Sequence, residues 1–299
     1  MRLIKQGFEI IEQPSGLEGM YKMIEMAGRT CYKSEDKITE TSAKEFVDRM
    51  IKSGHGAMLE HGTVYLDMPD SAGDYGLVPF FASNPYSELI VVPLEDREHN
   101  YITTNFRVII ENFAEEYIPD ILQYWCEPTE YHKKRYTVKW IIDRVTGESF
   151  LRHRVFSFAR ESTRYCNYSK DKFGNEITFI IPCWVSESQL GHHNCNKIIE
   201  ECRDFEAWSN PSEYSELSFI LSLALSEKGY FNLLNYGWKP QQARQVLPFS
   251  VSSPLVMTGF ASDWLHFFDL RCDSHAHPQA REIATALKEE FIKRGYIDE

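Results

Sequence analysis

The sequence contains no apolar stretch approaching the roughly 18 residues that a membrane-spanning helix needs. Its N-terminal segment carries charge and shows no apolar core followed by a small-residue cleavage site, so it does not read as a signal peptide. Its seven cysteines include no C-x-x-C pair. Free thiols in a reducing compartment are therefore expected rather than a disulfide framework. Together these absences predict a cytoplasmic protein with no membrane partner.

Two further absences narrow the function. No Gly-rich dinucleotide fingerprint follows a predicted strand, which argues against a nucleotide-cofactor enzyme of the Rossmann type. Positive charge is also in deficit, because 32 Lys and Arg face 44 Asp and Glu and the formal net charge is −12. Nucleic-acid binding relies on neutralising phosphates, so no nucleic-acid partner is expected. The 43% of hydrophobic residues is enough for a sizeable core.

Against this acidic background, residues 152–164 (RHRVFSFARESTR) are unusually basic. We expect a helix that starts near Thr146 and continues through this segment. About 120° of such a helix would hold five of its polar residues, namely Ser149, Arg152, His153, Arg160 and Arg164. Arg154 and Glu161 would pair on the opposite side.

Guanidinium groups gathered on one face repel each other unless an anion lies between them. The planar fork of arginine donors suits phosphate and carboxylate oxygens. The segment therefore predicts an anion site for a phosphorylated small molecule. The alternative is a solvated basic face, or one paired with the many carboxylates of the chain.

Two clusters of His, Cys and acidic residues could bind a metal. The first is HGAMLEH at 55–61, with His55, Glu60 and His61. The second is LRCDSHAHP at 270–278, which could be joined by His192, His193 and Cys195. The spacing of the first cluster matches no common zinc pattern. The second contains an H-x-H pair, which does occur as a ligand pair on strands, but this segment leads into a predicted helix. A zinc hydrolase or deaminase is therefore an alternative function, and no metal ligand is assigned.

Four segments together resemble the flavin-dependent thymidylate synthases. Arg152-His153-Arg154, followed after seven residues by Ser162, resembles the signature of that family. HGAMLEH (55–61), QARQVLP (242–248) and LRCDSHA (270–276) resemble three further family segments and occur in the family's order. The resemblance covers most of the chain, except for residues 69–133, which resemble an insertion relative to shorter members.

The resemblance implies an enzyme that methylates dUMP to dTMP. It uses methylenetetrahydrofolate as the carbon donor, FAD as the hydride carrier and NADPH as the reductant. It also implies an α+β fold, with a mixed, largely antiparallel sheet and long packed helices, formed by a single domain over residues 1–299. The active form would be a homotetramer whose active sites are shared between subunits.

The family's residue roles transfer to matching positions of this chain. Arg271 would be catalytic, because a guanidinium against the pyrimidine draws negative charge onto the ring and makes carbon five a better nucleophile. The dUMP-binding residues would be Ser149, Arg152, Arg160, Glu161, Ser162, Thr163, Arg164, Arg244 and Arg271. The FAD-binding residues would be His55, Glu60, Arg152, His153, Arg154 and His266.

Several positions depart from the family pattern. Ala57 replaces a hydroxyl residue, His266 replaces an Asn, and Phe260 and Ser262 stand where an Asn-x-Arg contacts flavin. Ala159-Arg160 replaces Asn-Glu, with Glu161 shifted to the adjacent position. A nucleotide-binding protein that has lost the redox chemistry is therefore a second alternative. Ser162 is interpreted as a hydrogen-bonding residue, and Cys166 and Cys183 as structural, rather than as nucleophiles.

Hydrophobic periodicity predicts the remaining elements. Ser42 and Glu45 form a capping-box pattern at the start of one helix, and the Gly-rich segment 54–62 is expected to be irregular, as is most of 69–100. The expected strands are 7–13, 63–68, 88–94, 101–105, 135–143, 177–182 and 251–259. The expected helices are 15–27, 42–52, 105–113, 117–125, 196–228 with a break at 210–211, 240–247, 262–271 and 278–294.

Overall fold

The structure is a computed structural model that describes residues 1–69, 72, 76–94, 97–164, 166–170, 174–202 and 211–298. Tyr165 and residues 203–210 of the helix expected over 196–228, which include Asn210 at the expected break, lie outside the described residues. Among the described residues no helix is both long and apolar enough to cross a membrane. All seven cysteines are described, and all are free thiols.

A four-stranded antiparallel sheet forms the centre of the molecule. Its strands are β2 (Gly7–Ile11), β6 (Arg135–Ile141), β10 (Leu255–Phe260) and β7 (Ser157–Arg160), in the order β2-β6-β10-β7. Successive side chains of β10 point to opposite faces of the sheet and contribute to the hydrophobic core on each face. Leu255 and Met257 join one hydrophobic cluster, while Val256 between them joins another.

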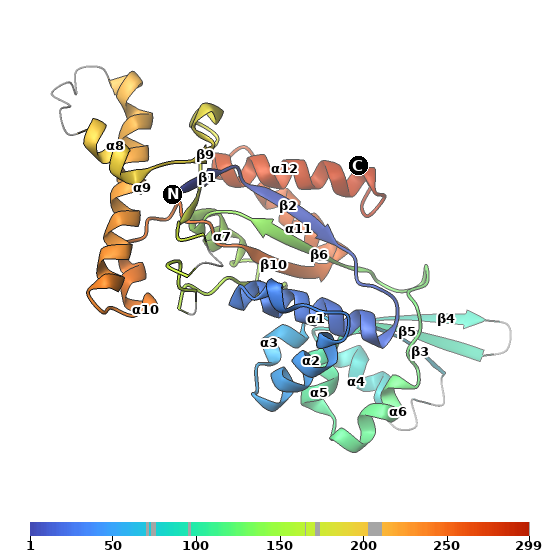
Figure 1. The fold of residues 1–299 in the computed structure, drawn as a ribbon. Helices are drawn as coiled ribbons and strands as arrows, with labels where there is room; N and C mark the ends of the chain where they lie inside the picture. The colour runs from blue at the N-terminus through green and yellow to red at the C-terminus, as the bar shows by residue number, and fades with distance from the viewer. Residues whose placement is uncertain are drawn as a thin grey trace.

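Helices cover both faces of this sheet (Figure 1). On one face lie α11 (Ala261–Arg271) and α12 (Pro278–Lys293), whose large aromatic residues Trp264, Phe267 and Phe291 pack with Trp140 of β6. On the other face lies α1 (Gly16–Tyr32), which packs with α2 (Ser42–Lys52) and α3 (Gly56–Leu59). The sheet is therefore buried on both sides and holds its strands firmly in place.

The described parts of residues 69–133 include helices and strands that share the core of α1. A second sheet has the order β3-β5-β4, with β3 (Thr63–Pro69), β5 (Arg97–Asn105) and β4 (Glu88–Leu94), and the β4–β5 hairpin projects from the body (Figure 1). Around it lie α4 (Leu77–Ser83), α5 (Phe106–Asn112), the 3₁₀ helix η3 (Glu115–Tyr117) and α6 (Ile118–Leu122). Phe81, Ile102 and Ile109 belong to the same cluster as Ile24 of α1.

The third sheet has the order β8-β1-β9, with β1 (Arg2–Ile4), β8 (Thr178–Ile180) and β9 (Gly191–His192). The β1–β8 pair is parallel and the β1–β9 pair is antiparallel. This sheet packs against α8 (Cys195–Glu201) and the long α9 (Pro211–Asn235). The remaining elements are η1 (Glu35–Lys37), α7 (Arg144–Phe150), η5 (Glu187–Gln189), α10 (Pro240–Ala243) and η6 (Arg244–Val246).

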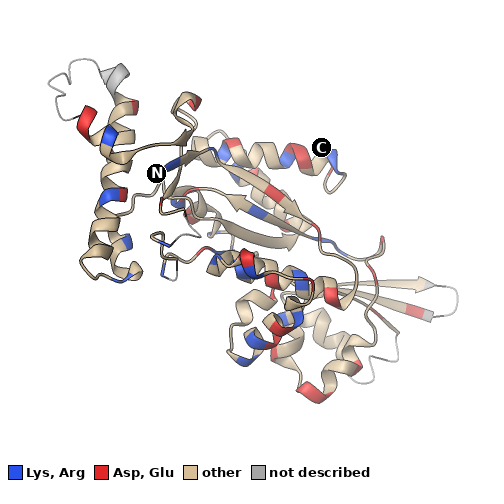
Figure 2. Cartoon of the chain, viewed as in Figure 1, with Lys and Arg blue, Asp and Glu red and all other residues tan. Residues whose placement is uncertain are grey.

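The α+β class with mixed, largely antiparallel sheets is confirmed, and so are most of the predicted elements. Three local predictions were wrong. Most of 69–100 was expected to be irregular, but α4 and the start of β5 lie there in addition to the expected strand β4. Segment 54–62 contains the short helix α3. The capping box at Ser42 does not form, because Thr41 is the N-cap and the Ser42 hydroxyl instead donates to Glu25 at 2.9 Å. Figure 2 shows acidic and basic residues interspersed along the chain rather than divided into two halves.

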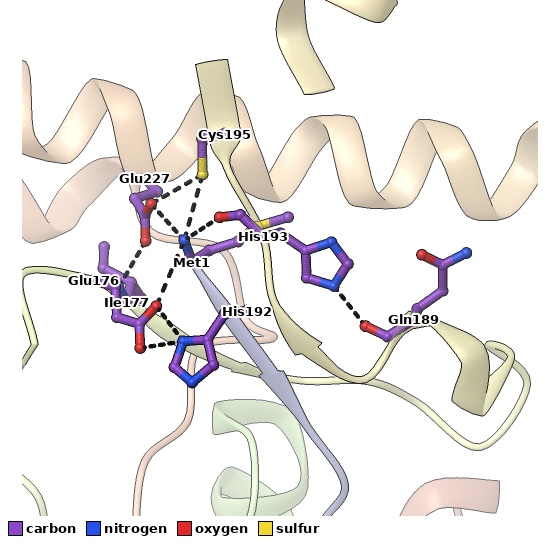
Figure 3. Close-up of polar contacts among 8 residues, drawn as sticks. All are labelled: Met1, Glu176, Ile177, Gln189, His192, His193, Cys195 and Glu227. Carbon is purple, nitrogen blue, oxygen red and sulfur yellow. Dashed lines mark hydrogen bonds and ion pairs between the residues drawn. The ribbon is translucent and has the colours of Figure 1, made fainter. Parts of the chain in front are cut away.

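The third sheet is anchored by the ammonium group of Met1 (Figure 3). This buried group donates to the Glu227 carboxylate at 2.8 Å and to the His193 carbonyl at 3.0 Å. Glu227 also accepts from the Cys195 thiol and from the Ile177 backbone N–H. Burial lowers the pKa of the ammonium, but the hydrogen bond and charge of Glu227 outweigh it, so the pKa is raised overall.

The Glu227→Gln variant should unfold more easily than the parent chain. Breaking a buried ion pair leaves one charge uncompensated and costs about 3 kcal/mol. Because the folded-state pKa of the Met1 ammonium is raised, the pair stabilises fully below about pH 8, the unfolded value, and loses its effect at higher pH.

Urea unfolding at several pH values measures this difference. It should be largest below pH 8 and should shrink above it. The exposed pair of Lys5 and Glu187 supplies the control, Glu187→Gln, which should change stability little. Equal stability of the Glu227→Gln variant and the parent at pH 7 would contradict the prediction.

Candidate active site

Residues 144–160 fold as a helix, a turn and a strand, so the single helix predicted from Thr146 through Arg164 was wrong. Asp143 caps α7 by accepting from the Thr146 N–H at 2.7 Å. The helix ends at Phe150, residues 151–156 turn, and β7 begins at Ser157. Phe156 fixes the turn, because its buried ring packs directly against Gly259. A Cβ atom at position 259 would lie only 2.4 Å from Cδ1 of that ring. Only glycine at position 259 allows this packing.

Arg271 and His153 form the centre of the site. The Arg271 Nε donates to His153 Nε2 at 2.9 Å, and its Nη2 donates to the Ser149 carbonyl at 2.6 Å. These contacts join the end of α11 to α7 and the following turn, across 118 and 122 residues of sequence. The fold therefore unites the first Arg-His-Arg segment with the C-terminal segment.

His153 is neutral in this arrangement. Its Nε2 accepts a hydrogen bond, so the ring proton belongs on Nδ1. Burial, together with the nearby charges of Arg271, His266 and Arg152, lowers the pKa of His153 to about 4. Burial and the charge of Arg152 also lower the pKa of Arg271. A half-buried guanidinium thus meets a neutral acceptor rather than a carboxylate.

The neighbouring cations line the approach to this centre. His153 is buried, whereas Arg152, Arg154 and His266 are exposed. The ring of His266 lies 6.2 Å from that of His153. Exposed basic side chains therefore neighbour a fixed, partly buried Arg–His pair.

A cavity of about 250 Å³ opens near the start of α7. Arg144, Thr163 and Arg244 line it on the polar side, and Leu247 and Phe249 are among its apolar residues. The Arg244 Nη1 donates to Thr163 Oγ1 at 2.9 Å. Two guanidinium groups and a hydroxyl in one small cavity suit an anion with several oxygens.

Arg160 is engaged within the protein rather than facing this cavity. Its guanidinium donates to Ser253 Oγ at 2.8 Å, to Glu148 Oε1 at 2.8 Å and to the Arg144 carbonyl at 3.3 Å. Burial is the main reason that the pKa of Arg160 is lowered. It thus ties β7 to α7.

Glu161 anchors the following loop to the end of α1. The predicted pair of Arg154 and Glu161 was wrong, because Glu161 is buried and accepts from Tyr168 at 2.8 Å, while Lys33 lies 3.1 Å away. The Ser162 N–H donates to the Cys31 carbonyl at 2.9 Å. Arg164 is exposed beyond this anchor.

The polar residues of segment 55–61, which contains α3, make contacts in different parts of the structure. His55 is exposed, its Nδ1 lies 2.9 Å from the Tyr32 hydroxyl, and it lines a cavity of about 680 Å³. Arg29, Lys37 and Arg49 line the same cavity. Glu60 instead accepts from Arg107 of α5.

His61 is fully buried and bonded to Thr258 at 2.8 Å. Burial and the charge of Arg135 lower its pKa to about 3. His61 is therefore a neutral residue of the interior.

Within the described ranges, no group of three or more His, Cys, Asp or Glu side chains is placed to hold a metal. His275 is exposed and pairs with Asp273, while His192 pairs with Glu176 beside Met1. Cys166 is buried, and burial raises the pKa of Cys183. Among the described residues, neither of the two clusters considered for zinc therefore forms a metal site.

Sequence reasoning missed two arginines, Arg144 and Arg135. Arg135 lies at the head of β6 and donates to Thr63 Oγ1, the Glu60 carbonyl and Ser157 Oγ at 3.1–3.3 Å. Burial lowers its pKa to about 10. It joins the 55–61 turn to β7. The one signal for Arg135 in the sequence was its position as a positively charged residue at the start of a strand with alternating polarity.

Comparisons with known proteins agree on one family. The family model described as "Thymidylate synthase complementing protein" matches residues 110–294. A flavin-dependent thymidylate synthase of Pyrococcus furiosus is 28% identical over 198 residues, covering 65% of this chain and 69% of that protein. One of Corynebacterium glutamicum is 22% identical over 276 residues, covering 92% and 76%. One of Synechocystis is 27% identical over 160 residues, covering 52% and 66%.

His153 should remain neutral to well below its usual pKa. Because its folded-state pKa is depressed, His153 favours the folded state fully above about pH 6.5, and this contribution is lost as the pH falls towards 4. Nitrogen-15 NMR of the imidazole groups should show a ring protonated on Nδ1, with its signal missing in His153→Gln.

The acid limb of urea stability between pH 6.5 and 4 should be shallower in His153→Gln than in the parent chain. The buried His61 remains in both proteins and cancels in the comparison. Titration of His153 near pH 6.5 would show that burial and the charge of Arg271 do not hold it in the neutral form.

Proposed function

The chain belongs to the thymidylate synthase complementing protein family, and we propose that it is a flavin-dependent thymidylate synthase. It methylates dUMP to dTMP with methylenetetrahydrofolate as the carbon donor, FAD as the hydride carrier and NADPH as the reductant. The contact between Arg271 and His153 carries the proposal. It brings two separate family segments into one site and leaves a guanidinium held by neutral groups.

Arg271 acts on the pyrimidine. Carbon five of uracil is a weak nucleophile, and a guanidinium beside the ring stabilises the negative charge that develops there. His153 and the Ser149 carbonyl each take one of its hydrogen bonds, which fixes its direction before substrate binds. Because both partners are uncharged, the positive charge remains available to the ring.

The phosphate of dUMP enters the cavity lined by Thr163 and Arg244. Arg244 is already directed at this cavity by its bond to Thr163. Ser162 and Arg164 follow on the same loop, which Glu161 and Lys33 hold against α1. Arg152 completes the positive surroundings, whereas Arg160 supports the site from behind through Glu148.

The donor set beside the 55–61 turn fits a flavin dinucleotide. His55 and the cations of its large cavity offer positive charge suited to a diphosphate. Arg152 and Arg154 add exposed positive charge on either side of His153 in the sequence. When bound, FAD supplies the hydride that reduces the one-carbon unit on the pyrimidine. His153 contacts Arg271 and lies 6.2 Å from the ring of His266, while Glu60 acts through Arg107.

We propose a single domain in which residues 69–133 are a family-variable insertion. Its apolar residues share the core of α1 and α2, which supports one folding unit. The free thiols are consistent with a cytoplasmic location.

The active form is proposed to be a homotetramer with shared active sites. Large apolar side chains stay exposed between α9 and the nucleotide cavity, which is unusual for an isolated chain. These are Leu225, Tyr236, Trp238, Val246 and Phe249. Phe249 also lines the cavity, so an adjoining subunit on this surface would cover the nucleotide site.

A nucleotide-binding protein without redox chemistry is the second candidate. One observation favours it, because Arg135 lies over the ring of Phe260 at 5.6 Å where a flavin-contacting Asn was expected. This candidate binds dUMP but not FAD.

Release of tritium from dUMP labelled at carbon five tests the reaction. With NADPH and methylenetetrahydrofolate, release should require FAD. The Arg271→Ala variant should lose at least about 100-fold in rate, as expected when a group stabilising transition-state charge is removed, and should still bind FAD. Arg294→Ala, at the end of α12, is the control and should react normally.

Release by the Arg271→Ala variant at the parental rate would remove Arg271 from the catalytic role. No release by the parent chain, combined with tight dUMP binding and no flavin spectrum, would favour the second candidate.

Light scattering should give a mass four times the 34.9 kDa chain. Leu225→Glu should lower this mass, because a charge would be buried in the proposed interface. Val91→Glu places the same charge on an exposed position of β4 and should leave the assembly intact. A monomeric parent chain would contradict the shared site.

A further inference from the structure

We propose that Arg144, which lies outside the segments carrying the family resemblance, binds the phosphate of the nucleotide and so helps to select dUMP over its nucleoside. The proposal rests on the proposed function for the identity of the nucleotide. It rests on the structure for the site, because Arg144 lines the same 250 Å³ cavity as Thr163 and Arg244.

The positive charge around this cavity is only partly compensated by the protein. Arg160 has its own partners in Ser253 and Glu148. Arg144 shares Glu148 at the longer distance of 3.8 Å, and the Glu148 side chain is 57% exposed. An exposed carboxylate at that distance compensates a guanidinium weakly. An anion in the cavity would meet Arg144 and Arg244 together.

The backbone fixes the relative positions of these two arginines. The Arg144 N–H donates to the Phe249 carbonyl at 2.9 Å, and Asp143 forms a β-bridge with Ser252. The start of α7 is thereby attached to the segment that follows Arg244. A two-armed anion site needs such rigidity, because each guanidinium must be placed before the ligand arrives.

The spacing along α7 fits one nucleotide bridging both parts of the site. Arg144 is its first residue, and Ser149, whose carbonyl holds Arg271, comes five residues later. At 1.5 Å per residue, these positions are about 7.5 Å apart along the helix. This matches the scale of a nucleoside monophosphate. The phosphate would lie at Arg144 and Arg244, and the base at Arg271.

Calorimetric titration with dUMP, deoxyuridine and inorganic phosphate tests the proposal. The Arg144→Ala variant should bind dUMP about 10- to 100-fold more weakly, as expected for the loss of a charge-assisted hydrogen bond. It should bind deoxyuridine with parental affinity. Arg144→Lys should be intermediate, because it keeps the charge but loses the fork. Arg294→Ala is the charge-matched control and should bind all three ligands normally.

The Glu148→Gln variant tests the same site in the opposite direction, because it should strengthen anion binding rather than weaken it. Removing the carboxylate that competes for Arg144 should tighten dUMP and phosphate binding several-fold. Weakening in both Arg144→Ala and Glu148→Gln would mean that α7 is merely disturbed, and would overturn the proposal. So would parental dUMP affinity in Arg144→Ala.

These outcomes separate the inference from the proposed function. If the parent chain binds inorganic phosphate, and Arg144→Ala loses this binding, the anion site stands even when dUMP does not bind and the proposed function fails. If the parent binds neither dUMP nor phosphate, the anion site is overturned as well.

Discussion

The candidate site depends on one hydrogen bond, from the Nε of Arg271 to a neutral His153. A carboxylate in the same place would hold the guanidinium more strongly but would cancel much of its field at the substrate. Burial and three neighbouring positive groups keep His153 uncharged. The arginine is therefore oriented without losing the charge that the proposed chemistry needs. The basic groups of this site repel one another in the protein without ligand. Their arrangement becomes favourable only when an anionic ligand is present.

The central sheet makes this contact possible. Strands β6, β10 and β7 lie in antiparallel register, and α11 follows β10 directly. The end of α11 consequently returns Arg271 to the turn after α7. Phe156 secures that turn by packing against β10 at Gly259, and Arg135 links the same region to the 55–61 turn. Packing thus sets the positions of polar groups from four distant parts of the sequence.

Hydrophobic periodicity predicted the elements whose pattern is long and regular, such as α12 and β6. The proposed roles of the arginines came from the family resemblance. Pattern failed over residues 152–164. Arginine favours helices, but Ser157 to Arg160 alternates between buried and partly buried positions and pairs with β10, so long-range pairing decided the outcome. Arg144 could not be found by pattern. A single arginine at a helix start suggests no function by itself. The proposed role of Arg144 depends on Arg244, which follows it by 100 residues in the sequence.

The departures at Arg160 and Glu161 need not signal lost function. Arg160 meets a carboxylate on the adjacent helix, Glu148, while Glu161 meets Lys33 and Tyr168 in the interior. Each unusual residue therefore has a partner within this chain, and both partnerships hold the loop that carries Ser162 and Thr163. Phe260 is different, since its ring is covered by Arg135 and offers no polar group to a flavin. The proposed flavin site accordingly relies on Arg154 and on the cations around His55.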